Sequence, residues 1–484
     1  MKKSLLLLLP LVLSTVTLAA CGGNNGGSKK TTITLWSITG KNNQGQLENY
    51  IKAFEDKYPE YKVNNVIQTG MGYNELKDAV VKGFSGNNYP DIVQCYPDHV
   101  ADYLDYGKAV NLDDYINDPE IGLTEEDKND YITSFMDEGK GYAFEGTYSL
   151  PYCKSTELMF YNEDVLLSLD LSKYDATING GKALDAAYFD NLTWEELFNK
   201  LCPALVKYND SLPEGKKILL SDQKYHAVFA YDSDDNLFIT LAEQYGYKYT
   251  SVDTSTGKGS IDFDNAEMKN LMKTFRTAAE KGYIISKGSA GNTYTNEYFT
   301  ANNTLFSVGS SGGVKYQFSD KNPMNVGVAR IPHAEGRNPK VILQGPSLTI
   351  LDHNDEARIR GSWLLWKTMT DAENSLDWAI NSGYMGIRNS NYENEDYKAA
   401  SDVKNTEEKT LARLMAKAST YVSNIINETY TSPAFKGSSA ARTAVGGLMT
   451  KVLTPTEGIE NIETSLKRVK NANLNALLDY KCSN

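Results

Sequence analysis

The sequence predicts an α/β protein that begins with a parallel sheet and contains at least two lobes. Predicted strands and helices alternate between residues 32 and 95, an order typical of parallel sheets with helices on their faces. The chain has 484 residues, which is enough for two or three domains of ordinary size. No short repeat of fixed period is visible in the sequence, which argues against a solenoid.

The spacing of apolar residues defines the first elements. In order, they are a strand at 32–36, a helix at 47–54, a strand at 62–67, a helix at 76–84 and a strand at 91–95. Pro59 is expected to end the first helix. Because ligands of parallel sheets bind beyond the carboxyl ends of the strands, we expect a site near 36–39 and 94–98.

Later elements are marked by caps and turn residues. Thr193 and Glu196 have capping-box spacing and predict the start of a helix. Residues 253–261 contain two glycines and predict a hairpin or turn. Two further helices are predicted at about 264–281 and at 356–370, the second with one apolar face.

The N-terminal residues have the features of a secretory signal. Lys2 and Lys3 precede an apolar run at 5–16, which is too short for a permanent membrane span. Small residues then precede Cys21, and this arrangement resembles the bacterial lipobox. The resemblance implies cleavage before Cys21 and lipidation of its sulfur; the alternative is an ordinary signal with a chance cysteine. Residues 22–30 are predicted to form a flexible tether.

The composition argues against several classes of function. A net charge of −13 makes the chain a poor candidate for binding nucleic acid. The sequence has no H-E-x-x-H motif, no G-x-S-x-G elbow and no P-loop, so we expect no enzyme activity, metal or cofactor. A hydrolase with paired carboxylates is a rival interpretation, because such carboxylates need not be close in sequence.

Four cysteines remain besides Cys21, and the sequence leaves their pairing open; they are Cys95, Cys153, Cys202 and Cys482.

Six segments resemble, in the same order, a known family: the extracellular solute-binding lipoproteins of ABC importers for oligosaccharides and glycerol phosphates. The segments are 35–36, 54–59, 89–93, 150–162, 296–313 and 363–388. The last of them follows the family pattern except at Gly386, where the family usually has proline. Each motif alone is weak, but their order behind a lipobox makes the resemblance specific.

The resemblance implies a two-lobed, periplasmic-binding-protein-like fold with a ligand cleft between the lobes and a hinge of several chain crossings. The expected segments are a signal peptide at 1–20, a lipidated tether at 21–30, lobe one at 31–152 with about 346–375, and lobe two at 153–345 with about 376–484. It also implies a monomer, anchored by lipid at the extracellular face of a bacterial membrane, that delivers its ligand to ABC permease subunits.

Candidate ligand contacts in lobe one follow from the chemistry of sugars. Sugars have hydroxyls and apolar C–H faces, so their sites need aromatic rings and hydrogen-bonding side chains. Trp36, Tyr73 and Tyr96 lie at or just after predicted strand ends, where each either faces the cleft or packs against its own lobe. Asp98 either accepts bonds from sugar hydroxyls or caps the helix that follows it.

The resemblance adds two groups of contacts near the crossing between lobes. Ser155 and Thr156 match ligand-touching positions of the glycerol-phosphate branch, or form a hinge without ligand contact. The small residues Gly309, Ser310 and Ser311 either donate to a phosphate or hydroxyl or form a plain turn.

The remaining candidates lie in the second half of the chain. Gly345 is expected to let the backbone approach the ligand, and Tyr384 matches a ligand-contacting position in relatives. Arg388 either contacts the ligand or pairs with an acidic neighbour. Arg442 either clamps a phosphate or forms a surface ion pair.

One segment partly matches an EF-hand calcium loop. Asp232, Asp234, Asn236 and Glu243 occupy ligand positions, but Leu237 stands where the loop needs glycine. We therefore expect no calcium site. The favoured interpretation is that Asp234 or Asp235 caps a helix and that this loop, including Asp232, lines the cleft of lobe two, as in relatives.

The favoured function is capture of an extracellular oligosaccharide for an ABC importer. Glycerol 3-phosphate or a glycerophosphodiester is the alternative ligand, because the crossing segment and the Gly-Ser-Ser-Gly-Gly loop resemble that branch. A surface adhesin or structural lipoprotein is the rival from another class, and it would need neither hinge nor cleft.

Overall fold

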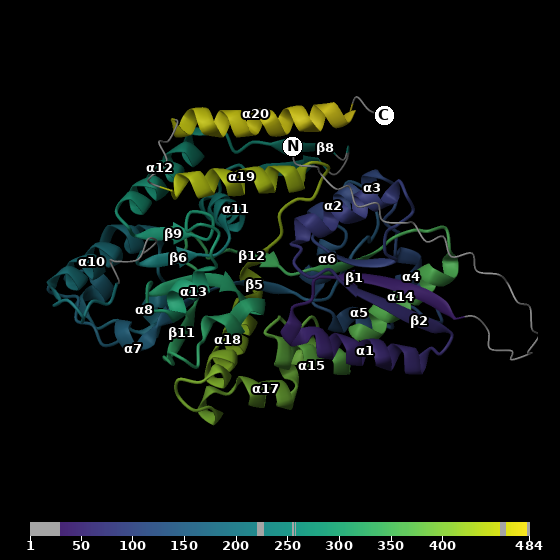
Figure 1. Cartoon of the computed structure of the whole chain (residues 1–484), viewed down its shortest axis with the longest axis horizontal. Coiled ribbons are helices and arrows are strands. Elements are labelled where there is room, and N and C mark those ends of the chain that lie inside the picture. The colour runs from purple at the N-terminus through teal and green to yellow at the C-terminus, as the bar shows by residue number, and fades with distance from the viewer. Residues whose placement is uncertain (1–29, 220–226, 254–255, 257, 455–460, 482–484) are drawn as a thin grey trace, which may run out of the picture.

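The computed structural model describes residues 30–219, 227–253, 256, 258–454 and 461–481, and it has two lobes (Figure 1). Lobe one is built on a five-stranded sheet with the order β2-β1-β3-β13-β4. Lobe two is built on a seven-stranded sheet with the order β14-β12-β5-β10-β6-β9, in which β11 also pairs with β5. Helices cover both sheets, so the predicted two-lobed α/β fold class is confirmed.

The sheet of lobe one begins with the three predicted parallel strands. Its strands are β1 (Thr31–Ser37), β2 (Tyr61–Ile67), β3 (Ile92–Cys95), β4 (Leu150–Pro151) and β13 (Ser347–Ile350). β1 is parallel to β2 and β3, whereas β13 runs antiparallel between β3 and β4. Ile33 and Leu35 are buried while Thr32 is exposed, which is the alternation that predicted β1.

The sheet of lobe two is arranged around β5. Its strands are β5 (Ser155–Asn162), β6 (Phe229–Tyr231), β9 (Ile284–Ser286), β10 (Phe306–Ser310), β11 (Val326–Ala329), β12 (Val341–Gln344) and β14 (Thr429–Tyr430). All eight residues of β5 are buried, because the strand pairs with β10 and with both β11 and β12. The antiparallel pairing of β7 (Thr250–Asp253) with β8 (Lys258–Ile261) confirms the predicted hairpin.

The predicted helices are present. The helices of lobe one, predicted or not, are α1 (Gln44–Lys57), α2 (Tyr73–Phe84), α3 (Pro97–Asp105), α4 (Asp113–Asn117), α5 (Glu125–Asp130), α6 (Thr133–Glu138), α14 (Glu356–Met369), α15 (Ala372–Ser382) and α16 (Asn389–Glu393). α1 buries the four apolar residues at helical spacing and ends two residues before Pro59. α14 matches the helix predicted at 356–370.

The helices of lobe two include one with a predicted cap. They are α7 (Glu163–Leu166), α8 (Ala186–Asp190), α9 (Trp194–Glu196), α10 (Cys202–Ser211), α11 (Asp234–Tyr245), α12 (Ala266–Glu280), α13 (Thr295–Thr300), α17 (Glu395–Ser401), α18 (Leu411–Ile425), α19 (Ser438–Val452) and α20 (Ile462–Lys481). The hydroxyl of Thr193 accepts a hydrogen bond from Glu196 N at 3.1 Å, which confirms the predicted N-cap of α9.

The chain passes between the lobes at 152–154 and again at 345–346. A third passage follows α16, and Figure 1 shows α15 below α1 in lobe one and α17 beside α18. Tyr50 of α1 donates to Asp377 of α15 at 2.5 Å. The packing therefore places residues 372–393 with lobe one, whereas the sequence assigned 376–484 to lobe two. The proposed boundary moves from about 375 to about 394.

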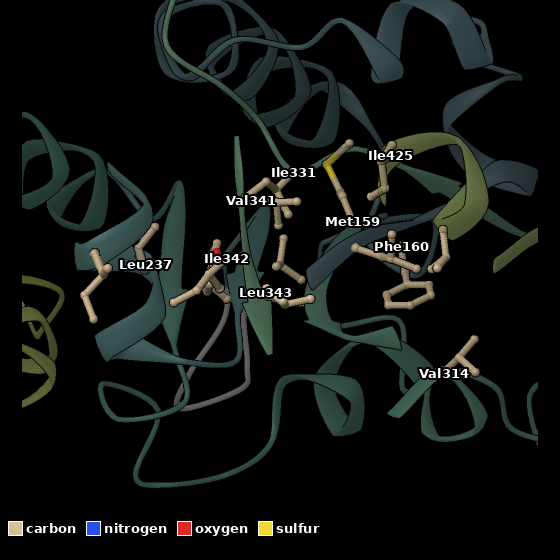
Figure 2. Close-up of a cluster of buried hydrophobic side chains, with 14 of the residues drawn as sticks. Met159, Phe160, Leu237, Val314, Ile331, Val341, Ile342, Leu343 and Ile425 are labelled. Atoms are coloured by element: carbon tan, nitrogen blue, oxygen red, sulfur yellow. The ribbon is translucent and has the colours of Figure 1, made fainter. Parts of the chain in front are cut away.

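Apolar side chains fill the space where β5 and β12 meet. Figure 2 shows Met159 and Phe160 of β5 beside Val341, Ile342 and Leu343 of β12, and all five are buried. This packing holds the crossing strands of the hinge rigidly against each other. Among the described helices, none is long and apolar enough to cross a membrane.

Candidate functional site

A pocket lies between the two lobes and encloses ≈ 540 Å³ of space, part of which is open to solvent. Lobe one contributes Tyr96, Asp98 and Glu138 to its lining, and lobe two contributes Tyr249 and Arg442. Apolar and hydroxyl side chains complete the wall. Such a mixture of aromatic, apolar and a few charged groups suits a polar small molecule.

Three oxygens of the pocket lining are buried without a hydrogen-bond partner among the described residues. They are Asp98 Oδ2, Thr250 Oγ1 and Ser432 Oγ. Buried polar atoms nearly always have a partner, and an unpaired one costs about 1–3 kcal/mol. These atoms come from both lobes, so a ligand that reached all of them would hold the lobes together.

The lobe-one side of the pocket lies at the carboxyl ends of the parallel strands, as expected. β3 ends at Cys95, and Tyr96 is the N-cap residue of α3. The rings of Tyr73 and Tyr96 meet edge to face, with centroids 4.5 Å apart. Asp98 is the second residue of α3 and makes no capping bond, so the cap interpretation of Asp98 is wrong. Its carboxylate is instead part of the pocket wall.

Trp36 lies near the end of β1 but outside the pocket lining. Its ring is half-buried and packs against the smaller core cluster of lobe one. The neighbouring backbone is held by Gln94, which accepts a bond from Ile38 N at 3.1 Å. The sequence left two possibilities open for Trp36, and the structure shows the second: the ring packs against its own lobe.

Arg442 is the cation of the lobe-two side, and its guanidinium is fixed by α11. Its Nε lies 2.6 Å from Asp235 Oδ2, and its Nη2 donates to Asn236 Oδ1. Burial acts to lower the pKa of Arg442, but Asp235 and Asp98 outweigh burial and raise it above its usual value. The side chain therefore stays charged and is held through Nε and Nη2, while Nη1 has no hydrogen-bond partner in the described part of the chain.

Ser155 and Thr156 are fully buried in β5. Thr156 Oγ1 donates to the carbonyl of Ile342 at 3.0 Å, and Thr156 N donates to Ser311 Oγ at 3.3 Å. These bonds link β5, β12 and the segment after β10. Thr156 and Ser311 thus act as structural ties of the crossing in this structure.

The small residues at the end of β10 lead directly into a 3₁₀ helix. Ser310 Oγ accepts a bond from Gly312 N at 3.2 Å and caps the 3₁₀ helix at Ser311–Gln317. At Gly309 an added Cβ would lie 3.0 Å from Gln317 Nε2.

At Gly345, with φ of 84°, an added Cβ would lie 1.8 Å from the carbonyl oxygen of Cys153. Glycine is required at 345 by the close approach of two crossing strands.

Tyr384 bridges the end of α15 and the 3₁₀ helix at Ser311–Gln317. Its ring stacks on Trp378 with centroids 5.9 Å apart and covers Gly312, where an added Cβ would lie 2.7 Å from the ring. Burial raises the pKa of the Tyr384 hydroxyl, and the nearby Cys153 and Tyr96 add to the rise. Its hydroxyl makes no hydrogen bond within the described part of the chain, and the same holds for Tyr73 and Tyr249.

Arg388 does not line the pocket. It is 3% exposed, and its guanidinium bonds to Asp127 and Asp130 at 3.1 Å and to the carbonyl of Thr370 at 2.8 Å. The ligand-contact interpretation of Arg388 is therefore wrong, and the ion-pair alternative holds. The reason is that α16 packs onto α5 of lobe one, and neither helix contributes a residue to the pocket lining.

Replacing Arg388 by methionine is expected to lower the free energy of unfolding by about 2–3 kcal/mol, because two partly buried carboxylates lose their partner. Chemical denaturation measures the loss. Ligand affinity, measured below the melting temperature of the variant, is expected to stay unchanged. A loss of affinity without a loss of stability would contradict this placement.

Asp232 and Asp234 are tied within lobe two rather than presented to the pocket. Asp232 accepts from Thr295 N at 3.1 Å, and Asp234 accepts from Gly288 N at 2.9 Å. The N-cap of α11 is Ser233, so the prediction that Asp234 or Asp235 caps the helix is wrong. No cluster of three potential metal ligands occurs among the residues that the structure describes.

Several residues of the site carried no sequence signal. Glu138 ends α6, and its Oε2 accepts bonds from Lys154, which is fully buried, and from Ser347 at 3.0 Å. Asp235 and Asn236 hold Arg442 from 206–207 residues away in sequence. Only the fold brings such groups together. The sequence pattern around Asp235 predicts a helix cap and gives no indication that Asp235 pairs with Arg442.

The cysteines in the described part of the chain are not paired. Cys95, Cys153 and Cys202 are free and buried. Burial raises the pKa of each thiol, which makes them poor nucleophiles. Cys21 and Cys482 lie outside the described residues, so lipidation of Cys21 stays a prediction.

The chain matches a known protein family and is similar to several solved structures. A family model described as bacterial extracellular solute-binding protein matches residues 49–405. UgpB from Mycobacterium tuberculosis, solved with glycerophosphocholine, has a TM-score of 0.68 at 17% identity, over 93% of this chain and 100% of that one. The GacH receptor of Streptomyces glaucescens, solved with acarbose, has a TM-score of 0.66 at 16% identity, over 93% and 99%.

A third solved structure is similar to the same extent. MalE from Bdellovibrio bacteriovorus, bound to maltotriose, has a TM-score of 0.64 at 13% identity, over 92% of this chain and 100% of that one. At such identities these likenesses show the fold. No curated protein sequence matches the chain.

Proposed function

Because the chain belongs to the bacterial extracellular solute-binding proteins, we propose that it captures a small solute between its lobes and delivers it to an ABC permease. The observation that carries the proposal is the pocket, whose polar lining comes from both lobes. Asp98 of lobe one and Arg442 of lobe two line it together. A ligand that bonds to both favours the closed arrangement over the open one by its differential affinity.

An oligosaccharide is the proposed ligand. The pocket lining offers acceptors on Asp98 and Glu138 and the side chains of Tyr96 and Tyr249. Tyr73 and Tyr384 lie outside that lining, and Tyr73 packs against Tyr96. Sugar hydroxyls both donate and accept, so they match such a set, while tyrosine faces pack against the C–H faces of the ring. The solved structures with acarbose and maltotriose have this fold, which supports the same class of ligand here.

A phosphate ester of glycerol is the second candidate, and one feature favours it. Arg442 lies in the first turns of α19, and the pocket is also lined by Ser438 at the N-terminus of that helix. A fixed guanidinium at a helix N-terminus suits a phosphate. Asp98 opposes a second negative charge, whereas the charge of Glu138 is paired with Lys154, so a diester would suit the pocket better than a phosphate monoester.

We place the protein at the extracellular face of the membrane as a monomer, anchored through Cys21, and we assign it no catalysis and no cofactor. Its family consists of solute-binding proteins. Labelling of the expressed protein with a fatty acid, and loss of the label in Cys21→Ser, tests the anchor.

Addition of the ligand is expected to raise the melting temperature of residues 22–484. A ligand at 100 times its dissociation constant stabilises by about 2.7 kcal/mol. Maltooligosaccharides, glycerol 3-phosphate and glycerophosphocholine are the compounds to screen. A shift with maltooligosaccharides alone supports the oligosaccharide, and a shift with the phosphate esters alone supports the second candidate. The absence of a shift across a widened panel would favour the adhesin.

A further inference from the structure

Glu157 is a buried carboxylate that the proposed function does not use directly. It lies in β5 next to Thr156, is 1% exposed, and both of its oxygens have partners in lobe two. Tyr231 of β6 donates its hydroxyl to Oε2, and Asn236 of α11 donates Nδ2 to Oε1 at 3.0 Å. Glu157 is therefore held by two separate elements of the lobe.

Asn236 connects Glu157 to Arg442. Its Nδ2 bonds to the carboxylate, and its Oδ1 accepts a bond from Nη2 of Arg442. A carboxylate only accepts and a guanidinium only donates, so this is the one orientation of the amide that satisfies both neighbours. The orientation of Asn236 is thus fixed from both ends while Glu157 is ionised. A proton on Oε1, the oxygen that does not bond Tyr231, would turn that oxygen into a donor facing Nδ2 and remove the constraint.

Fixing Asn236 also fixes the guanidinium. Asp235 holds Nε at 2.6 Å and Asn236 holds Nη2, so two of the three nitrogens of Arg442 are bonded within lobe two. Nη1 is the nitrogen left for the pocket that Arg442 lines with Asp98. A rotated Asn236 amide would put its own N–H₂ group against Nη2, and two donors repel each other.

We propose that Glu157 is a positioning residue of the pocket, which orients Arg442 through Asn236 when ionised and releases it when protonated. The inference rests on the proposed function, since Arg442 matters only if the pocket binds a ligand.

The surroundings of Glu157 place this switch near neutral pH. Burial raises the pKa of Glu157 to about 7, against the opposing effect of the bonds from Tyr231 and Asn236. The titratable and charged groups that face it are Tyr231, Asp235, Tyr430 and Arg442. Burial raises the pKa of both tyrosines, so they stay neutral here. Glu157 is therefore ionised above about pH 7, and Arg442 loosens as the pH falls below it.

The test follows the Nε–H resonance of Arg442 in ligand-free protein labelled with ¹⁵N-arginine. The signal is assigned by its loss in Arg442→Lys. In the natural protein the resonance is expected to titrate with a midpoint near pH 7, and in Glu157→Gln this titration is expected to be absent. Because no ligand is added, a failure of the proposed function leaves this result unaffected.

A second variant guards against misfolding of Glu157→Gln. Tyr231→Phe removes one bond to the carboxylate and keeps the ring, so the midpoint is expected to move to higher pH. A titration that persists unchanged in both variants would overturn the proposal, because another group would then cause it. A resonance that does not titrate between pH 5 and 9 in the natural protein would overturn it as well.

Discussion

Replacing Lys154 by methionine is expected to lower the free energy of unfolding by about 3–5 kcal/mol, because it leaves a buried carboxylate unpaired. The Lys154 side chain is 0% exposed and that of Glu138 is 4% exposed. Lys154 Nζ bonds to Glu138, to Ser347 Oγ at 2.9 Å and to the carbonyl of Gly345 at 3.3 Å. These bonds join α6 to the first two chain passages between the lobes.

Two controls separate this effect from a general cost of losing a lysine. Lys52→Met removes an exposed ion pair with Asp56 and is expected to change stability by no measurable amount. The double variant Lys154→Met with Glu138→Leu removes both charges and is expected to recover much of the loss. Equal losses in the single and double variants, measured by chemical denaturation, would contradict the account.

Replacing Arg442 by leucine is expected to weaken ligand binding by about thirtyfold or more. Truncating one partner of a buried, hydrogen-bonded charge pair costs about 2–5 kcal/mol, and about 1.4 kcal/mol corresponds to a factor of ten. Two effects combine here, because Nη1 no longer reaches the ligand and Asp235 is left without its cation. Calorimetric titration with the compound identified by thermal shift measures the change.

The matched control for Arg442 is an arginine of the same lobe at the surface. Arg337 is exposed and lies outside the pocket lining, so Arg337→Leu is expected to leave affinity unchanged. An Arg442→Leu variant that binds within a factor of three of the natural protein would remove Arg442 from the site. Equal weakening in both variants would point to a general electrostatic effect instead.

Elements whose signals are local could be predicted from the sequence. The strand at 32–36 shows its alternation within a few residues, and the helix at 47–54 has its apolar face in two turns. The N-cap at Thr193 needs only the residue three positions on. The place of Tyr96 and Asp98 followed from strand order, because ligand sites of parallel sheets lie at the carboxyl ends of strands.

The parts of the site that depend on distant contacts could not be predicted. Arg388 had two possible partners in the sequence, and only the packing of α16 on α5 brings it to Asp127, 261 residues away. Asp235 looks like a helix cap in the sequence because it precedes an apolar run, yet Ser233 holds the N-cap position, without a side-chain capping bond, and Asp235 faces Arg442. Nothing in the sequence distinguishes Lys154 from its neighbours in the crossing segment, because its partner Glu138 is brought to it only by the packing of α6.

If one small molecule is held between the two lobes, its binding must protect both of them. Hydrogen exchange, followed with and without the compound identified by thermal shift, measures this protection. We expect slower amide exchange both at the start of α3, around 96–99, and in α19 at 438–442, with no change in α8 and α10. Protection confined to one lobe, or located away from these helices, would contradict it.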